Sequence, residues 1–147
     1  MNQRSDTGQR LLQPAAWPRP RGYANGIAAT GETIFLAGQI GWDARGRFAP
    51  DLPSQVGQAL SNIVTLLAEA GAEPQHVVRL TWFVIDLPAY RSQQIAIGEA
   101  YRRVIGRHFP AMSVIGVSQL VEQAALVEIE ATAVLPPWHP PQPGSGT

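Results

Sequence analysis

Apolar residues recur along the chain with two different spacings, and these spacings predict the secondary structure. Between residues 54 and 70 they return every three or four positions, which places them on one face of a helix. Ser54 is a suitable N-cap for this helix, and Gly71 is suited to the position just beyond its end. A second helix is predicted over about residues 89–106.

Segments rich in β-branched and aromatic residues predict five strands, over residues 23–30, 33–40, 77–86, 111–117 and 126–134. Gly31 and Glu32 separate the first two strands, so these are expected to pair as a hairpin. The order ββαβαββ predicts an α+β domain, a two-layer sandwich with two helices on one face of a sheet. The other face is not consistently polar, and it is therefore expected to contact another subunit.

Proline marks both ends of the chain, since 8 of the 13 prolines fall within residues 1–20 and 136–147. Proline lacks a backbone N–H and disfavours both helix interiors and central strands. We therefore predict an N-terminal tail over residues 1–20, a folded domain over 21–135 and a proline-rich C-terminal tail over 136–147.

Composition narrows the classes of partner. Charged residues make up 15% of the 147 residues, against about a quarter in an average soluble protein. This low charge suggests that part of the surface is covered by copies of the chain. The 11 basic and 11 acidic residues balance, so neither nucleic acid nor a membrane surface is expected as a partner.

Cysteine is absent, which excludes disulfides, thiol catalysis and thiolate metal ligands. The three histidines have no ligand spacing, and no glycine-rich phosphate loop is present, so neither a metal nor a cofactor is expected. No stretch is long and apolar enough to span a bilayer. These features together predict a soluble cytoplasmic protein.

Two glutamates in the last predicted strand are candidates for chemistry. Glu128 and Glu130 lie two positions apart, so both side chains point to one face of the sheet. Paired carboxylates can serve as acid and base. The alternatives are a solvated face, or an ion pair between one glutamate and an arginine such as Arg79.

Two further positions carry weaker signals. Tyr23 can offer a hydroxyl to a ligand, or it can be an aromatic side chain that covers the sheet edge. Gly38 within a strand lets a ligand approach the backbone closely, although such a glycine also marks a bulge.

Three segments together carry a family resemblance: residues 35–40 (FLAGQI), 109–114 (FPAMSV) and 127–131 (VEIEA). In order and spacing they resemble the signature of the Rid family, also called YjgF or reactive-intermediate deaminases. The resemblance implies a chorismate-mutase-like fold and a homotrimer with sites at its subunit interfaces. It also implies hydrolysis of small reactive enamines or imines.

The resemblance assigns roles to individual residues. Glu128 falls on the family's glutamate, which implies that it positions or activates a water. Tyr23 matches a pocket tyrosine that often comes from the neighbouring subunit. Ala37 and Gly38, with Ser113 and Val114, fall on segments that hold the substrate.

Met112 departs from the family pattern, because deaminating members carry there an arginine that grips the substrate carboxylate. Ala37 and Val114 likewise replace the serine and cysteine common in the family. Loss of one such charge pair costs on the order of 2–5 kcal/mol, so a 2-imino acid is expected to bind poorly unless another arginine, such as Arg79 or Arg21, reaches the pocket.

The sequence and its resemblance therefore predict a deaminase-type hydrolase of a small enamine or imine other than a 2-imino acid. The alternative is a homologue that binds a small molecule without catalysis. A third possibility, an RNA-directed activity, is disfavoured by the neutral charge.

Overall fold

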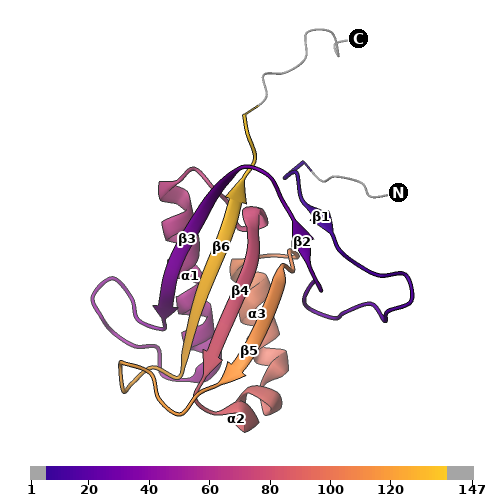
Figure 1. The fold of residues 1–147 in the computed structure, drawn as a ribbon. Coiled ribbons are helices and arrows are strands. Elements are labelled where there is room, and N and C mark those ends of the chain that lie inside the picture. The colour runs from indigo at the N-terminus through magenta and orange to yellow at the C-terminus, as the bar shows by residue number, and fades with distance from the viewer. Residues whose placement is uncertain (1–5, 139–147) are drawn as a thin grey trace, which may run out of the picture.

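A four-stranded mixed sheet forms the centre of the protein in this computed structural model, which describes residues 6–138. Its strands are β3 (Glu32–Ile40), β4 (Val77–Val84), β5 (Ala111–Gly116) and β6 (Val127–Leu135), in the order β3-β6-β4-β5 (Figure 1). The central strand β6 runs antiparallel to both of its neighbours, whereas β4 and β5 are parallel. A parallel pair needs a crossover connection, and the second helical region supplies it.

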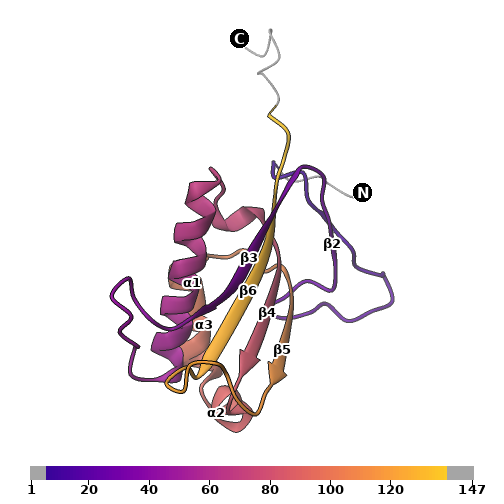
Figure 2. The same ribbon diagram turned by 60° about the vertical axis from the view of Figure 1, so that its left-hand side comes forward.

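The helices cover one face of this sheet (Figure 2). They are α1 (Leu52–Glu69), α2 (Leu87–Ser92) and α3 (Gln94–Val104), with a 3₁₀ turn, η1 (Pro74–His76), before β4. The two-layer α+β arrangement predicted from the sequence is confirmed.

The limits of the helices differ in part from the prediction. Asp51, not Ser54, caps α1, because its Oδ1 accepts a hydrogen bond from the Ser54 N–H at 2.9 Å. Gly71 follows the helix end with a φ of 71°, in the conformation expected of it. The predicted second helix is interrupted at Gln93, whose φ of −114° and ψ of 22° leave the helical region.

The core lies between the helices and the covered face of the sheet. Along β6, Val127, Ile129 and Ala131 point to the helices and are almost fully buried. They pack in one apolar cluster with residues of α1 such as Leu60 and Ile63. The regular alternation of strand side chains therefore gives β6 one apolar face and one polar face.

No helix formed by residues 6–138 covers the other face of the sheet (Figure 2). It carries Glu128, Glu130 and Thr132 of β6 together with large apolar side chains. Phe35 of β3 is 79% exposed and Ile115 of β5 is 44% exposed.

The N-terminal region corrects the predicted hairpin. Only Ile27–Ala28 form strand β2, and this strand pairs with β1 (Arg10–Leu11) in a separate two-stranded sheet, the N-terminal ribbon. Strand β3 pairs with β6 and not with the segment that precedes it. Gly31, with a φ of 150°, carries the chain between the sheets and lies against the Leu135 backbone, where a Cβ would clash.

Part of the segment predicted as an N-terminal tail thus pairs with the body of the domain. At the other end, Trp138 is 80% exposed, and residues 139–147 of the predicted C-terminal tail lie outside the described residues. None of the helices within residues 6–138 has the length and apolar character required to cross a membrane.

Candidate functional site

Gly38 and Glu128 lie against each other where β3 meets β6. The ladder shifts register between Leu36 and Gln39, so that Ile40 comes to lie opposite Glu128. A Cβ placed on Gly38 would lie 2.7 Å from both Cγ and Cδ of Glu128, which is too close for any real side chain. The bulge and the missing side chain of Gly38 therefore let the Glu128 carboxylate lie over the backbone of β3.

Glu128 is half-buried, and its carboxylate has no hydrogen bond or ion pair with any residue between 6 and 138. The ion pair with Arg79 that the sequence left open is not formed by either glutamate. Phe83 of β4 is the cross-strand neighbour of Glu128 and gives the carboxylate an apolar flank. A carboxylate without a bound cation keeps its oxygen atoms available to accept a proton from water.

Glu130 lies on the same face but in a different environment. It is exposed, pairs across the ladder with Thr81, and likewise has no partner within the described residues. Glu130 is therefore a matched comparison for Glu128, with the same side chain, strand and face but no glycine beside it.

The residues predicted around Met112 divide between the two faces. Met112 and Val114 pair with Leu80 and Trp82 and pack against the apolar core on the covered face. Ser113 points to the uncovered face, where it is exposed opposite Thr81. Within one chain, Met112 and Glu128 thus lie on opposite faces of the sheet.

Tyr23 lies at the far end of β5 from the Glu128 level. The Ala24 N–H donates to the Pro110 carbonyl at 3.0 Å, and Ala24 forms a bridge with Ala111 at the start of β5. Glu128 is instead level with Phe83 and Ile115, four residues or about 13 Å further along the strand. Tyr23 is 43% exposed, so its side chain is available but not beside Glu128 of its own chain.

Ala37, the remaining predicted residue, is exposed in β3 beside Gly38. Its carbonyl accepts a hydrogen bond from the Gln39 side chain at 3.2 Å. Of the predicted site residues, the structure therefore brings Ala37, Gly38 and Glu128 together, and it places Tyr23, Met112, Ser113 and Val114 elsewhere.

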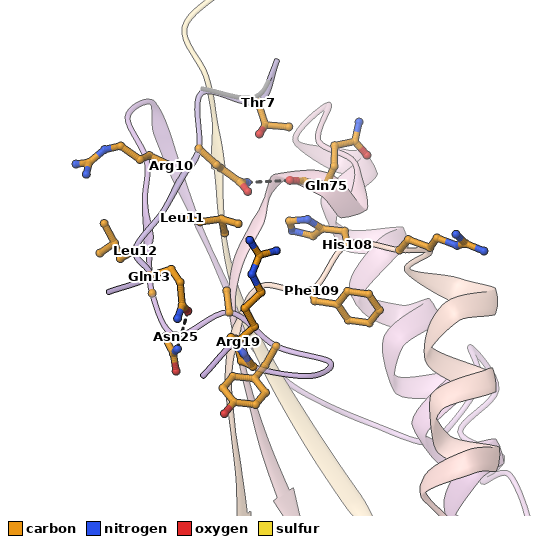
Figure 3. Close-up of a pocket in the computed structure, with 16 residues that line it drawn as sticks. Thr7, Arg10, Leu11, Leu12, Gln13, Arg19, Asn25, Gln75, His108 and Phe109 are labelled. Atoms are coloured by element: carbon orange, nitrogen blue, oxygen red, sulfur yellow. Dashed lines mark hydrogen bonds between the residues drawn. The ribbon is translucent and has the colours of Figure 1, made fainter. Parts of the chain in front are cut away.

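The structure reveals a cavity of about 790 Å³ beside Tyr23, between the N-terminal ribbon and the loop that leads into β5 (Figure 3). Its lining residues include Arg19, Asn25, Arg107, His108 and Phe109. No sequence pattern predicts this cavity, because its walls come from segments far apart in the chain.

An aromatic cluster lies on the helix-covered side of the sheet, next to the edge strand β5. The Tyr101 ring stacks on Phe109 at 5.5 Å and on Trp82 at 6.3 Å between centroids. The Tyr101 hydroxyl donates to the His108 carbonyl, and burial raises the pKa of this hydroxyl well above its usual value. Tyr101 is therefore a structural donor at neutral pH rather than a proton-transfer group.

The described residues contain no cluster of three or more histidine, cysteine, aspartate or glutamate side chains that could hold a metal ion.

Comparison with known proteins gives consistent matches. The family model described as endoribonuclease L-PSP matches residues 15–135. The 2-iminobutanoate/2-iminopropanoate deaminase of Capra hircus is 30% identical over 131 residues, which cover 88% of this chain and 92% of that protein.

Solved structures agree with these matches. The Rid-family protein YyfB from Yersinia pestis, described as of unknown function, has a TM-score of 0.77 at 34% identity and covers 87% of this chain and 99% of its own. The YjgF gene product of E. coli has a TM-score of 0.62 at 30% identity, with coverage of 80% and 91%.

Proposed function

This chain belongs to the RidA/YjgF family, and we propose that it is a deaminase-type hydrolase of a small enamine or imine. The observation that carries the proposal is the half-buried carboxylate of Glu128 lying over Gly38, with no cation bound to it in the described part of the chain. That carboxylate can accept a proton, and the glycine leaves room for a small ligand beside it.

The reaction follows from these groups. Glu128 takes a proton from a water as the water oxygen attacks the imine carbon, and the C=N π electrons move to nitrogen. Backbone groups near Gly38 hold the developing charge. Glu128 returns this proton to the nitrogen, which gives a carbinolamine. Glu128 then takes the proton of the new hydroxyl and passes it to the nitrogen as the C=O bond forms and the C–N bond breaks, so that the products are a carbonyl compound and ammonia. An enamine enters the same route after protonation at carbon.

A homotrimer with sites at its subunit interfaces is part of the proposal. Met112 and Tyr23 do not lie beside Glu128 of their own chain, so a pocket that uses all three requires a second copy. The uncovered face offers apolar surface for such a contact, with Phe35 79% exposed and Ile115 44% exposed. The absence of cysteine fits the cytoplasmic location that we propose.

Complementation between two inactive variants tests this shared site. Glu128→Gln removes the base, and Tyr23→Phe removes the hydroxyl proposed to come from the neighbour. Each variant alone should release little ammonia from freshly generated imines, and subunits mixed by unfolding and refolding together should recover part of the activity. If mixing restores nothing while each variant is folded, the two residues do not act across an interface.

Met112 indicates that the substrate lacks a carboxylate, because a thioether cannot replace the two charge-assisted hydrogen bonds of an arginine fork. Wild type should therefore act on an uncharged imine better than on 2-iminopropanoate, and Met112→Arg should reverse this preference. A wild type that acts on no imine in the panel, yet is thermally stabilised by apolar small molecules, would favour the alternative of a binding protein without catalysis.

A further inference from the structure

The cavity beside the N-terminal ribbon has a charge unlike that of the chain as a whole. The protein carries equal numbers of basic and acidic residues, yet the cavity lining contains Arg10, Arg19 and Arg107 and no aspartate or glutamate. None of the three arginines forms an ion pair with another residue in the range 6–138. A concave site lined by one sign of charge concentrates ligands of the opposite sign.

Arg19 is the cation best placed to use this field. Figure 3 shows its side chain between the N-terminal segment and the side chains of His108 and Phe109, whereas Arg10 points away. The His108 ring is already bonded to the Val77 carbonyl at 2.6 Å through Nε2. The guanidinium therefore stands in the cavity with its donors unused by any carboxylate of the described chain.

The loop that carries Arg19 is held in place by Gln13. The Gln13 Nε2 lies within 3.2–3.3 Å of the carbonyls of Pro14, Trp17 and Pro18, and its Oε1 accepts from Asn25 Nδ2 at 2.9 Å. The exposed Gln13 amide thus ties the loop to the segment after Tyr23. A loop fixed before binding loses less conformational entropy when a ligand arrives.

The ribbon itself is fastened to the domain on the far side of the cavity. Gln9, which is 7% exposed, donates from Nε2 to the Gln75 carbonyl at 2.8 Å (Figure 3). The Leu12 N–H donates to the Gly26 carbonyl at 2.9 Å. Both walls of the cavity are therefore supported by hydrogen bonds that do not involve Arg19.

The remaining walls are largely apolar. Leu11, Leu12 and Phe109 line the cavity together with the Tyr23 ring. A volume of about 790 Å³ lies within the range of roughly 300–1,000 Å³ typical of small-molecule sites. The site combines a guanidinium fork with apolar surface of limited extent.

We propose that this cavity binds a small organic acid, a single carboxylate on a compact apolar or aromatic body, with Arg19 as the group that binds the carboxylate. The cavity lies away from Glu128 of the same chain, but it shares Tyr23 with the intersubunit site proposed above. Ligand binding measured by calorimetry tests it without any ammonia release, so its failure can be told apart from failure of the proposed hydrolysis.

Phenylacetate and its uncharged isostere phenylacetamide test the proposal by isothermal titration calorimetry on the full chain. Phenylacetate should bind with one site per chain, and phenylacetamide should bind at least tenfold more weakly. Arg19→Gln should weaken phenylacetate binding about tenfold or more, as expected for loss of a hydrogen bond to a charged group. Arg19→Lys should recover part of that loss.

Arg10→Gln is the matched control, because it removes the same charge from a side chain that points away. It should change the affinity less than threefold, whereas Gln13→Ala, which frees the loop, should weaken binding through loss of Arg19 placement. Thermal melting checks that each variant is folded.

Three results would overturn the assignment. Equal affinities for phenylacetate and phenylacetamide would show that the carboxylate charge does not contribute to binding. Equal losses of phenylacetate affinity for Arg10→Gln and Arg19→Gln would show that overall positive charge attracts the ligand, without a specific contact to the Arg19 guanidinium. Inorganic phosphate binding more tightly than phenylacetate would assign the site to a phosphate-bearing ligand.

Discussion

The two faces of strand β6 carry side chains of opposite character. Val127 and Ile129 point to the helices and are fully buried, whereas Glu128 and Glu130, their immediate neighbours, point to the uncovered face. The side chains of Val127 and Ile129 pack in the apolar core. The carboxylates of Glu128 and Glu130 have no hydrogen-bond or ion-pair partner within the described residues.

The difference shows how one nine-residue strand serves two purposes. Because successive side chains alternate, residues that stabilise the fold and residues available for chemistry occupy the same strand without competing for space. Substitutions on the covered face should therefore change stability, and substitutions on the uncovered face should change assembly or activity.

The largest effect on stability is expected from Ile129→Ala on the covered face. Removing a fully buried branched side chain leaves a cavity and should lower the free energy of unfolding by about 2–5 kcal/mol. Urea unfolding at a fixed protein concentration measures it. Glu130→Ala on the other face should stay within about 0.5 kcal/mol of wild type, and comparable losses in both variants would remove the distinction between the faces.

Phe35→Ser tests the uncovered face as a contact surface. A phenylalanine that becomes buried on assembly should contribute roughly 1.5–3 kcal/mol, so the serine variant should dissociate at more than tenfold higher concentration. Sedimentation equilibrium measures this, and circular dichroism should show an unchanged fold because the ring is 79% exposed in the single chain. An unaltered assembly would place the contact elsewhere.

Gly38→Ala and Gly57→Ala make a matched pair of smaller changes. The added methyl at Gly38 meets the Glu128 side chain, so it should displace the carboxylate and cost about 1–3 kcal/mol. At Gly57, within α1, the added methyl would lie 3.7 Å from Ala100 Cβ, which is an ordinary van der Waals contact. Because alanine favours a helix over glycine, Gly57→Ala should raise the free energy of unfolding by about 0.5–1 kcal/mol. Equal melting temperatures for the two variants would contradict the close packing of Gly38.

Asp51→Ala should lower the free energy of unfolding by about 1 kcal/mol through loss of the α1 cap. The hydrogen bond from the Ser54 N–H lowers the pKa of Asp51 below its ordinary 3.8. Its stabilisation is therefore present above pH 3.8 and is lost as the pH falls through the lower folded pKa. Unfolding curves of wild type and variant should converge in acid, and a constant difference down to the lowest pH would contradict the cap.

Local patterns predicted the elements of the fold well. The three- and four-residue spacing identified α1, and the β-branched segments identified β3 to β6, because these signals depend on neighbours in the chain. The single long second helix was wrong, since the backbone leaves helical geometry at Gln93. The hairpin was wrong because β3 pairs with β6, a partner distant in sequence.

Only part of the candidate site could be predicted from the sequence. The resemblance pointed to Gly38 and Glu128, and the structure brings these two into contact. The side of the sheet on which Met112 lies, and the cavity around Arg19, depend on strand register and on loops that meet in space. Neither property leaves a periodic signal in the sequence.

The central claim is that Glu128, and not its neighbour on the same face, is the base for imine hydrolysis. The most direct test compares kcat/KM for ammonia release in wild type, Glu128→Gln and Glu130→Gln on the best uncharged imine. We predict a loss of about 100-fold or more for Glu128→Gln and less than twofold for Glu130→Gln. Equal values for the two variants would contradict the assignment of Glu128.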